Sequence, residues 1–330
     1  MTLDNIIEEI KKAESIVILT HDTPDGDAMG SSLAMKLAIE SLGKTVDVII
    51  PEYSSCFKFL PGINEIKKES NIEKYDLAIS VDCANNKILS GYQKYFEKAK
   101  TKIVIDHHGS NMMFGDINFV NPVAPACCEV LVGMFDYFGI KITKDIGTCI
   151  ITGIITDTGG FNYNVTPETF DFAAMLLRKG IKISEVYQKA LKTKTKASFE
   201  LEKIARDRLE FLEDGKVTFT YLTLEDEKNV GAKTGDHEGI VEVGRDIEGV
   251  EVSILLHERK ENGFKISLRS KEYVNVSDVC LMFGGGGHIR AAGAFQMGNV
   301  EQIKEKVLAQ IKKQLKWFRG DIFGWYNFNK

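Results

Sequence analysis

The segment 15–43 reads SIVILTHDTPDGDAMGSSLAMKLAIESLG, and the fold prediction rests on it. Its first six residues form a short apolar, largely β-branched run, which is typical of a buried strand. A polar loop follows, and from Met29 to Leu42 the apolar residues recur at helical spacing until Gly43, a residue type that often ends helices. A strand that leads through a loop into a helix is part of a βαβ unit, so the segment predicts a parallel sheet.

The same alternation continues through the first half of the chain. Further strand candidates lie at 45–50, 77–81 and 102–105, and helical patterns lie at 127–138 and 167–177. This order predicts an α/β fold whose N-terminal domain is a doubly wound, mostly parallel sheet with helices on both faces. Ligands of such sheets bind at the carboxyl ends of the strands.

The pattern changes after Gly180, where a charged helical stretch is followed by strand-like sequence with one Asn-Gly turn. We therefore predict an N-terminal domain over 1–183, a helical linker over 184–212 and a smaller C-terminal α/β domain with a mixed sheet over 213–330. The C-terminal domain ends in an aromatic tail, 317–330, to which the sequence assigns no role.

The 330 residues include 42 Lys and Arg against 47 Asp and Glu, a formal net charge of −5. This balance disfavours binding to long duplex nucleic acid but permits a compact phosphate ligand. The first fifteen residues carry four acidic side chains and no signal-peptide core, and no apolar run is long enough to span a membrane. Six cysteines without a CxxC motif indicate reduced thiols. We expect a cytoplasmic protein with no membrane partner.

Polar residues with metal-binding chemistry follow four successive strand candidates, the last of which is the apolar run 146–155: His21, Asp25 and Asp27; Asp82; Asp106, His107 and His108; and Asp157. Taken singly, each cluster also fits a capped turn or, for the histidine pair, a solvated loop. Together they offer oxygen and nitrogen ligands without thiolate, which suits Mn²⁺, Mg²⁺ or Fe²⁺ better than structural Zn²⁺. Their number favours two ions, and a two-metal site predicts hydrolysis of a phosphoester or phosphoanhydride.

Five segments, in this order, resemble the motifs of the DHH phosphoesterase superfamily: HDTPDGDAMGS (21–31), SVDCAN (80–85), DHHGSN (106–111), TDTGGF (156–161) and GGGGHIRAAGA (284–294). The last segment is similar to the signature of the DHH-associated C-terminal domain. The resemblance spans about Met1 to Leu315. Within the superfamily, the compact two-domain form is similar to the bifunctional oligoribonucleases that also dephosphorylate 3′-phosphoadenosine 5′-phosphate (pAp).

The resemblance implies two Mn²⁺ ions, with Mg²⁺ or another divalent ion as substitute, and a bridging hydroxide as nucleophile. The resemblance implies His21 and Asp25 as ligands of one ion and Asp27, His107 and Asp157 as ligands of the other. Asp82 would be shared by both ions. His108 would lie beside the reacting phosphate, and Asp106 would orient a histidine.

The glycine run would let backbone N–H groups approach a phosphate, although a flexible hairpin or linker is the alternative. The resemblance implies that the loop, together with an arginine on a neighbouring strand, binds the terminal 5′-phosphate or base of the substrate in a cleft between the domains. The substrate-binding candidates are Gly285, Gly286, Gly287, His288, Arg290, Arg269 and, less strongly, Arg245. A salt-bridged surface residue is an equal alternative for Arg245.

These observations lead to one expected function and several alternatives. We expect a Mn²⁺-dependent phosphoesterase that cuts short oligoribonucleotides to 5′-mononucleotides and converts pAp to AMP. The alternatives are a cyclic-di-AMP or pApA phosphodiesterase, a manganese inorganic pyrophosphatase, and a metal-binding or nucleotide-sensing protein without turnover. Because the superfamily often forms dimers, a homodimer is also considered. His237 and His257 lie outside the motifs and are interpreted as surface or packing residues.

Overall fold

The computed structural model describes the backbone of residues 2–326 and the side chains in that range except those of Ser90 and 316–326. The chain divides into two compact units, Met1–Lys194 and Thr195–Lys330. The division falls inside the segment predicted as a helical linker. The predicted domain limits therefore remain a prediction, and each unit is described by itself.

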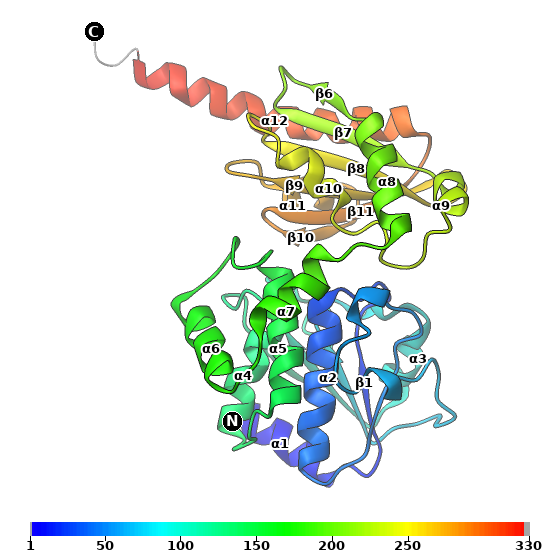
Figure 1. Cartoon of the computed structure of the whole chain (residues 1–330), viewed down its shortest axis with the longest axis vertical. Coiled ribbons are helices and arrows are strands. Elements are labelled where there is room, and N and C mark those ends of the chain that lie inside the picture. Colours follow the sequence, from blue (N-terminus) through cyan, green and yellow to red (C-terminus); the bar gives the residue numbers. More distant parts are fainter. Residues whose placement is uncertain (1, 327–330) are drawn as a thin grey trace. The chain divides into compact units, whose positions relative to one another are not determined.

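The N-terminal unit is built on a parallel sheet with the strand order β2-β1-β3-β4-β5 (Figure 1). Its strands are β1 (Ile16–Leu19), β2 (Val46–Val48), β3 (Leu77–Val81), β4 (Thr101–Asp106) and β5 (Ile117–Val120). Every residue of β1 and β3 is buried, as expected for central strands covered on both faces. The sequence did not indicate β5, an edge strand whose four residues are all half-buried.

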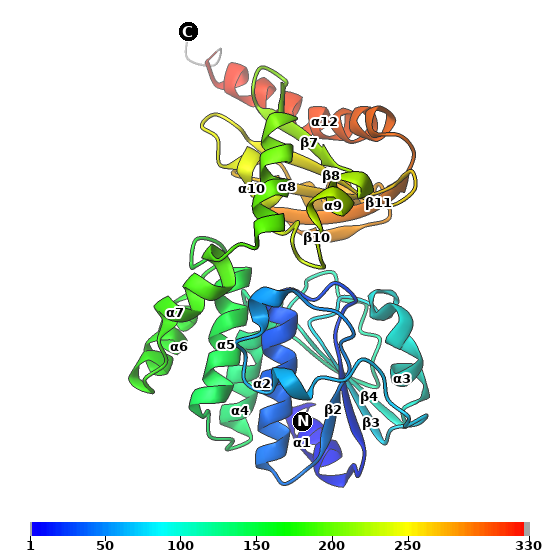
Figure 2. The ribbon, with the colours of Figure 1, turned by 45° about the vertical axis from the view of Figure 1, so that its right-hand side comes forward.

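Helices cover both faces of this sheet, which confirms the doubly wound prediction. The helices are α1 (Thr2–Lys12), α2 (Gly26–Ser41), α3 (Gln93–Lys98), α4 (Cys127–Tyr137), α5 (Lys144–Asp157), α6 (Pro167–Arg178) and α7 (Ile183–Tyr187). Figure 2 shows α2, α4 and α5 on one side of the sheet and α3 on the other. Each side has its own apolar core, one around Leu33 and Ile150 and the other around Leu19 and Phe96.

One sequence-based expectation about this unit is wrong. The run before Asp157 was grouped with the strands, but it forms α5, and Asp157 is the last residue of that helix. Thr143 caps the helix by accepting a hydrogen bond from the backbone N–H of Ile146. Since α5 packs against α2 and α4, most of its surface is apolar, and a short apolar run alone does not distinguish a buried helix from a buried strand.

Two glycines allow α2 and α5 to pack with their backbones unusually close. A Cβ atom on Gly30 would lie 2.5 Å from the carbonyl oxygen of Cys149, and one on Gly153 would lie 2.3 Å from Asp27 Oδ1. No real Cβ atom approaches that closely, so these helices can lie at this distance only with glycine at both positions. The same approach brings the start of α2 next to the end of α5.

The C-terminal unit has a six-stranded sheet with the order β10-β11-β9-β8-β7-β6. Its strands are β6 (Glu210–Leu212), β7 (Val217–Leu222), β8 (Val252–Lys260), β9 (Gly263–Ser270), β10 (Gly286–His288) and β11 (Ala291–Met297). Only β7 and β8 pair in parallel, which confirms the predicted mixed sheet.

The helices of this unit also lie on both faces of its sheet: α8 (Lys196–Asp207), α9 (Leu224–Val230), α10 (Ile240–Arg245), α11 (Val276–Leu281) and α12 (Val300–Tyr326). α11 and α12 pack on one face, while α8 and α10 pack on the other. Residues 327–330 of the predicted aromatic tail, and the side chains of 317–326, lie outside the described part of the chain. Within the described residues, no helix combines the length and the apolar character that a membrane crossing requires.

We predict that Gly153→Ala lowers the free energy of unfolding by about 1–3 kcal/mol, because the added methyl group must displace Asp27 or Cys128. Urea denaturation measures this change. Gly133→Ala is the matched control, since Gly133 lies exposed within α4 and a Cβ there meets nothing within 4 Å. Its expected effect is a gain of about 0.5–1 kcal/mol. Equal stability of the two variants would contradict the close helix packing.

Candidate metal centre

The predicted ligands of the N-terminal unit meet at the carboxyl edge of its parallel sheet. Three of them follow strands: His21 after β1, Asp82 after β3 and His107 after β4. The other three belong to helices: Asp25 caps α2, Asp27 lies in the first turn of α2, and Asp157 is the last residue of α5. Parallel strands end at the same edge, and the tight packing of α2 on α5 adds the two helical contributions.

Their ligand atoms form two compact groups, each with all atoms within 4.8 Å of one another: His21, Asp25 and Asp82, and Asp27, His107 and Asp157. His107 and Asp82 connect the groups, because His107 Nε2 lies 3.2 Å from Asp157 Oδ2 and 3.5 Å from Asp82 Oδ1. The family resemblance implies a pair, a triad and a shared Asp82, and this division remains a prediction, since Asp82 also lies within 4.8 Å of ligand atoms of Asp106, His107 and His108.

His107 is oriented by the backbone. Its Nδ1 lies 3.1 Å from the carbonyl oxygen of Ala124, so the proton of a neutral ring belongs on Nδ1. Nε2 then presents its lone pair toward the carboxylates, including Asp27 Oδ2 at 3.8 Å. This is the usual arrangement of a metal-binding histidine, whose second nitrogen donates to an acceptor outside the metal site.

Two of the aspartates bind helix N-termini. Asp27 accepts hydrogen bonds from the backbone N–H groups of Cys127 at 2.5 Å and Cys128 at 2.9 Å, at the start of α4. Asp25 caps α2 by accepting from the N–H groups of Asp27 and Ala28. The unpaired N–H groups at a helix start favour negative charge, so both carboxylates are stabilised where they converge. The sequence offered capping as an alternative to metal binding, but one aspartate can do both.

Asp82 is the most constrained of the predicted ligands. Its φ of 54° lies in the left-handed region, which an aspartate adopts at some energetic cost. Its backbone N–H is held by the carbonyl of Ile105 in β4. The side chain is buried, and its Oδ1 accepts no hydrogen bond. A buried carboxylate oxygen in this state is costly unless a cation binds it.

The carboxylates lie close together in a buried environment, where both burial and mutual repulsion disfavour their charged forms. Burial and the neighbouring Asp82 raise the pKa of Asp27 to about 7. Burial and Asp27 raise the pKa of Asp157 well above its ordinary value. Burial acts on Asp82 in the same direction, but His107, His21 and His108 outweigh it and hold the pKa of Asp82 well below its usual range. A bound cation would relieve this repulsion.

The donor set fits two divalent cations such as Mn²⁺ or Mg²⁺. It consists of carboxylate oxygens and imidazole nitrogens, which these hard ions accept. The cysteines nearby do not add thiolate ligands, because burial raises the pKa of Cys83, Cys127 and Cys128 well above the ordinary value. His21 and Asp25 would contribute to one ion, Asp27, His107 and Asp157 to the other, and Asp82 to both.

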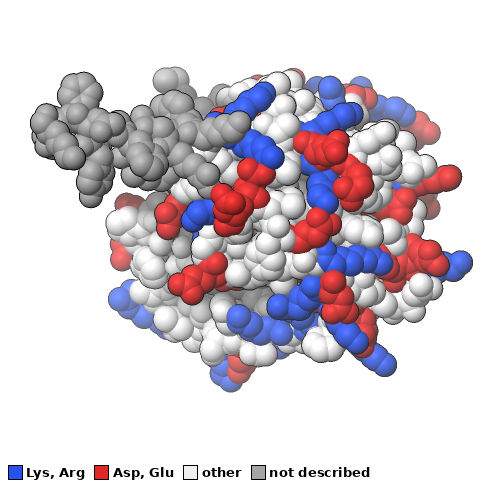
Figure 3. Space-filling view, turned by 90° about the horizontal axis from the view of Figure 1, so that it is seen from above, with Lys and Arg blue, Asp and Glu red and all other residues white. Residues whose placement is uncertain are grey.

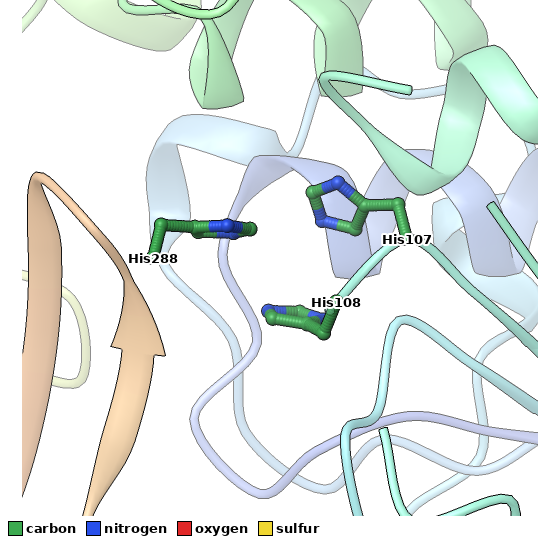
Figure 4. A group of neighbouring side chains, drawn as sticks. All are labelled: His107, His108 and His288. Carbon is green, nitrogen blue, oxygen red and sulfur yellow. The ribbon is translucent and has the colours of Figure 1, made fainter. Parts of the chain in front are cut away.

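A third histidine, His108, lies beside these ligands. Figure 4 shows the rings of His107 and His108, and their centroids are 4.6 Å apart. His108 Nδ1 lies 2.8 Å from Asp106 Oδ1, so the buried Asp106 orients this histidine. Asn111 in turn donates to Asp106 Oδ2 at 2.6 Å and to the carbonyl of Cys83. Sequence reasoning gave Asn111 no role, although it stands in the same motif five residues after Asp106.

The glycine-rich segment of the C-terminal unit differs from the expected phosphate loop. It forms the β10–β11 hairpin, in which Gly286 pairs with Gly293. The N–H groups of Gly284 and Gly285 donate to carbonyls at the end of α11, so they are not available to a phosphate. A Cβ on Gly285 would lie 2.1 Å from the carbonyl oxygen of Gly293, and Gly287 has a φ of 140°. The close strand pairing therefore accounts for at least two of the glycines.

The three candidate arginines have different environments. Arg290 donates to the backbone carbonyls of Glu272 and Val274, which holds the loop before α11. Arg245 is buried and forms an ion pair with Asp246. Arg269, on β9, forms an ion pair with Glu242 at 2.8 Å but keeps 28% of its side chain exposed. Arg245 is therefore the least accessible candidate, whereas Arg269, Arg290 and His288 of β10 are all half-buried.

We predict that saturating Mn²⁺ raises the melting temperature of the chelator-treated protein and that Asp82→Ala removes this gain. At about a hundred times Kd, a ligand that binds only the folded state stabilises it by about 2.7 kcal/mol. Melting curves with EDTA or Mn²⁺ test this. Asp136→Asn, at an exposed position of α4, is the control and should retain the full shift. An undiminished shift in Asp82→Ala would contradict the proposed shared ligand.

Comparison with known proteins identifies the family of the chain. Residues 15–154 match the DHH family, N-terminal domain, and residues 214–316 match the DHHA1 domain. The bifunctional oligoribonuclease and PAP phosphatase NrnA of Thermus thermophilus is 33% identical over 94% of this chain and 93% of its own length. The cyclic-di-AMP phosphodiesterase PdeA of Listeria monocytogenes is 25% identical over 93% of this chain and 48% of its own length.

Two solved structures are similar to the whole chain. An exopolyphosphatase-related protein from Bacteroides fragilis has a TM-score of 0.84 and 28% identity, over 94% of this chain and 96% of that one. RecJ from Thermus thermophilus, in complex with Mn²⁺, shares the fold with a TM-score of 0.55 and 14% identity, over 94% of this chain and 54% of that one. The chain therefore belongs to the DHH family, with a DHHA1 domain after its DHH domain, and is a hydrolytic phosphoesterase.

Proposed function

We propose that the chain hydrolyses short oligoribonucleotides to 5′-mononucleotides and pAp to AMP, using two divalent cations, preferably Mn²⁺. The observation that carries the proposal is the presence of two neighbouring ligand groups. Asp82 of one group and His107 of the other connect them, with 3.5 Å between Asp82 Oδ1 and His107 Nε2. The similarity to NrnA over nearly the full length of both chains supports the choice of substrate.

The proposed chemistry divides between the cations and the chain. Bound divalent ions would act as Lewis acids on the phosphoester and would lower the pKa of a water, so that hydroxide is available as the nucleophile at neutral pH. Burial lowers the pKa of His108, but Asp106 and Asp82 outweigh it and raise the pKa above its ordinary value. The protonated ring then donates from Nδ1 to Asp106, and its Nε2 proton can pass to the leaving oxygen. The side chain of His108 is 22% exposed, whereas that of His107 is only 2% exposed. This difference suits a ligand role for His107 and a substrate contact for His108.

The distribution of charge supports a small substrate. The chain has a net charge of −5, and on the face drawn in Figure 3 acidic and basic side chains are interspersed. Proteins that bind long nucleic acids usually present a continuous basic surface to the phosphates. Arg269 and His288 of the C-terminal unit would contact the terminal phosphate or base of a short substrate.

A second candidate function is hydrolysis of cyclic-di-AMP or of linear pApA. It is favoured by the similarity to PdeA, of which this chain covers about half. Both functions use the same metal ligands, so they differ only in which dinucleotide is accepted. A manganese pyrophosphatase or a metal-binding protein without turnover would share the ligands but would not cleave a dinucleotide.

We predict Mn²⁺-dependent release of mononucleotide from a 5′-phosphorylated RNA dinucleotide and of AMP from pAp. Parallel reactions with cyclic-di-AMP and inorganic pyrophosphate identify the alternatives, and chromatography quantifies the products. Faster turnover of cyclic-di-AMP than of pAp and the RNA dinucleotide would support the second candidate. Hydrolysis of pyrophosphate alone would refute both, and no turnover of any substrate would favour a binding protein.

Two substitutions should separate catalysis from substrate binding. His108→Ala should lower kcat by roughly 10²–10⁴-fold, because the proton donor to the leaving oxygen is lost. Arg269→Ala should mainly raise KM, since it removes a charge that contacts substrate away from the reacting bond. Steady-state kinetics with the RNA dinucleotide measure both, and Arg178→Ala, at an exposed position of α6, is the control. A pure kcat loss in Arg269→Ala would refute its assignment to substrate binding.

A further inference from the structure

Three residues outside the DHH motifs form a second cluster of metal-binding groups, entirely within the C-terminal unit. Glu227 lies in α9, His237 in the turn between α9 and α10, and His257 in β8. One ligand atom from each lies within 4.8 Å of the others. The sequence presents both histidines as isolated residues, and the fold brings them together.

The geometry of this cluster is close to that of a metal site. His257 Nε2 lies 2.7 Å from Glu227 Oε1, and the ring centroids of His237 and His257 are 4.3 Å apart. The side chain of His257 is 1% exposed, and its Nδ1 is buried without a hydrogen bond. Glu227 is 24% exposed, so an ion can reach the cluster from solvent.

The segment that carries Glu227 is held rigidly. Arg208 donates two hydrogen bonds to Asp226, the preceding residue, at 2.5 and 2.9 Å. Asp226 also forms a capping box with Thr223 at the start of α9. These contacts fix the first turn of α9, in which Glu227 lies. A metal site requires ligands whose positions are fixed by their surroundings in this way.

The turn that carries His237 is fixed as well. Asp236 is buried and accepts hydrogen bonds from the backbone N–H of Lys233 and from the hydroxyl of Thr195. Gly235 and Gly239 flank His237 with φ values of 88° and 79°, which a residue with a side chain rarely adopts. His257 lies within the sheet, paired with Leu222 of β7 and Lys265 of β9.

We propose that Glu227, His237 and His257 bind a divalent transition-metal ion of the Zn²⁺ type, at a site separate from the DHH metal centre. Two imidazoles and one carboxylate form a common Zn²⁺ ligand set, in which a water occupies the fourth position. Tetrahedral Zn²⁺ would place the ligand atoms about 3.3 Å from one another. His257 Nε2 and Glu227 Oε1, now 2.7 Å apart, would therefore separate slightly to admit the ion. The ion would replace the proton between His257 and Glu227.

The surroundings of His237 are compatible with this proposal. Burial and His257 lower the pKa of His237 to about 2, with smaller contributions from Lys265 and Arg259. The two cationic side chains oppose a cation, so the site should prefer ions with strong affinity for imidazole over Mg²⁺ or Ca²⁺.

A metal at this position would connect three segments: α9, the turn 231–239 and β8. Polar contacts already join α9 to β8, through Glu227 and His257 and through Leu224 and Glu258, and the ion would add His237 of the turn. Because the ion would bind only when these segments are folded together, it would stabilise the C-terminal unit. The site would thus act structurally, and it does not depend on the proposed phosphoesterase substrate.

The test is Zn²⁺ stoichiometry, measured by equilibrium dialysis and metal analysis of the chelator-treated full chain. Glu227→Gln and His237→Gln should each lose one equivalent of Zn²⁺ relative to the wild type at the same free Zn²⁺ concentration. Glu225→Gln, an exposed acid on the same helix, should lose none. Asp82→Ala should retain this equivalent, because its carboxylate belongs to the other metal centre. Glu225 is exposed, Glu227 and His237 are half-buried, and Asp82 lies in the N-terminal unit, so none of the substitutions removes a buried apolar side chain of the C-terminal unit.

Two further readouts separate metal binding from a structural ion pair. Zn²⁺ should shift the imidazole NMR resonances of His237 and His257 and should raise the melting temperature of Asp82→Ala but not of the double variant Asp82→Ala, Glu227→Gln. Mn²⁺-dependent hydrolysis should be unchanged in Glu227→Gln. Equal Zn²⁺ stoichiometry in the wild type, Glu227→Gln and His237→Gln would overturn the proposal, leaving the cluster as a His–Glu ion pair with a stacked histidine.

Discussion

The mutual repulsion of buried carboxylates is the constraint on which the N-terminal unit depends. Asp27, Asp82 and Asp157 are held together at one sheet edge, and the pKa of Asp27 is raised to about 7 there. The chain partly compensates this charge with helix N-termini and histidines. Protonation of Asp27 and Asp157, favoured by their raised pKa, or bound cations would supply the rest, so we expect metal binding to stabilise the unit.

The scaffold of this site is mostly backbone. The carbonyl of Ala124 orients His107, and the N–H groups at the start of α4 hold Asp27. Gly30 and Gly153 allow α2 and α5 to approach until the two helical aspartates meet. Backbone groups move less than side chains do, so they position ligands with the precision that a two-metal site requires. As a result, Asp27 has two roles, because it caps the start of α4 and is also a predicted metal ligand.

Much of the site could be predicted because its residues follow strands. Asp82 and His107 come directly after β3 and β4, whose apolar runs are unambiguous in the sequence. The prediction was wrong about the run before Asp157, which is a helix buried on most sides and not a strand, although Asp157 itself lies with the other predicted ligands. It also missed Asn111, whose only signal is its distance from Asp106, and it read the glycine run as a phosphate loop although close strand pairing requires some of those glycines.

The sequence by itself determined the fold class, the family and the kinds of ligand atom, because these follow from apolar periodicity and from short motifs whose members are adjacent in the chain. Only the tertiary structure decided which residues share a site. Glu227, His237 and His257 are spread over thirty positions and show no motif spacing, yet the register of β8 and the capped start of α9 bring them within 4.8 Å. Such proximity arises from long-range packing, which local sequence patterns do not record.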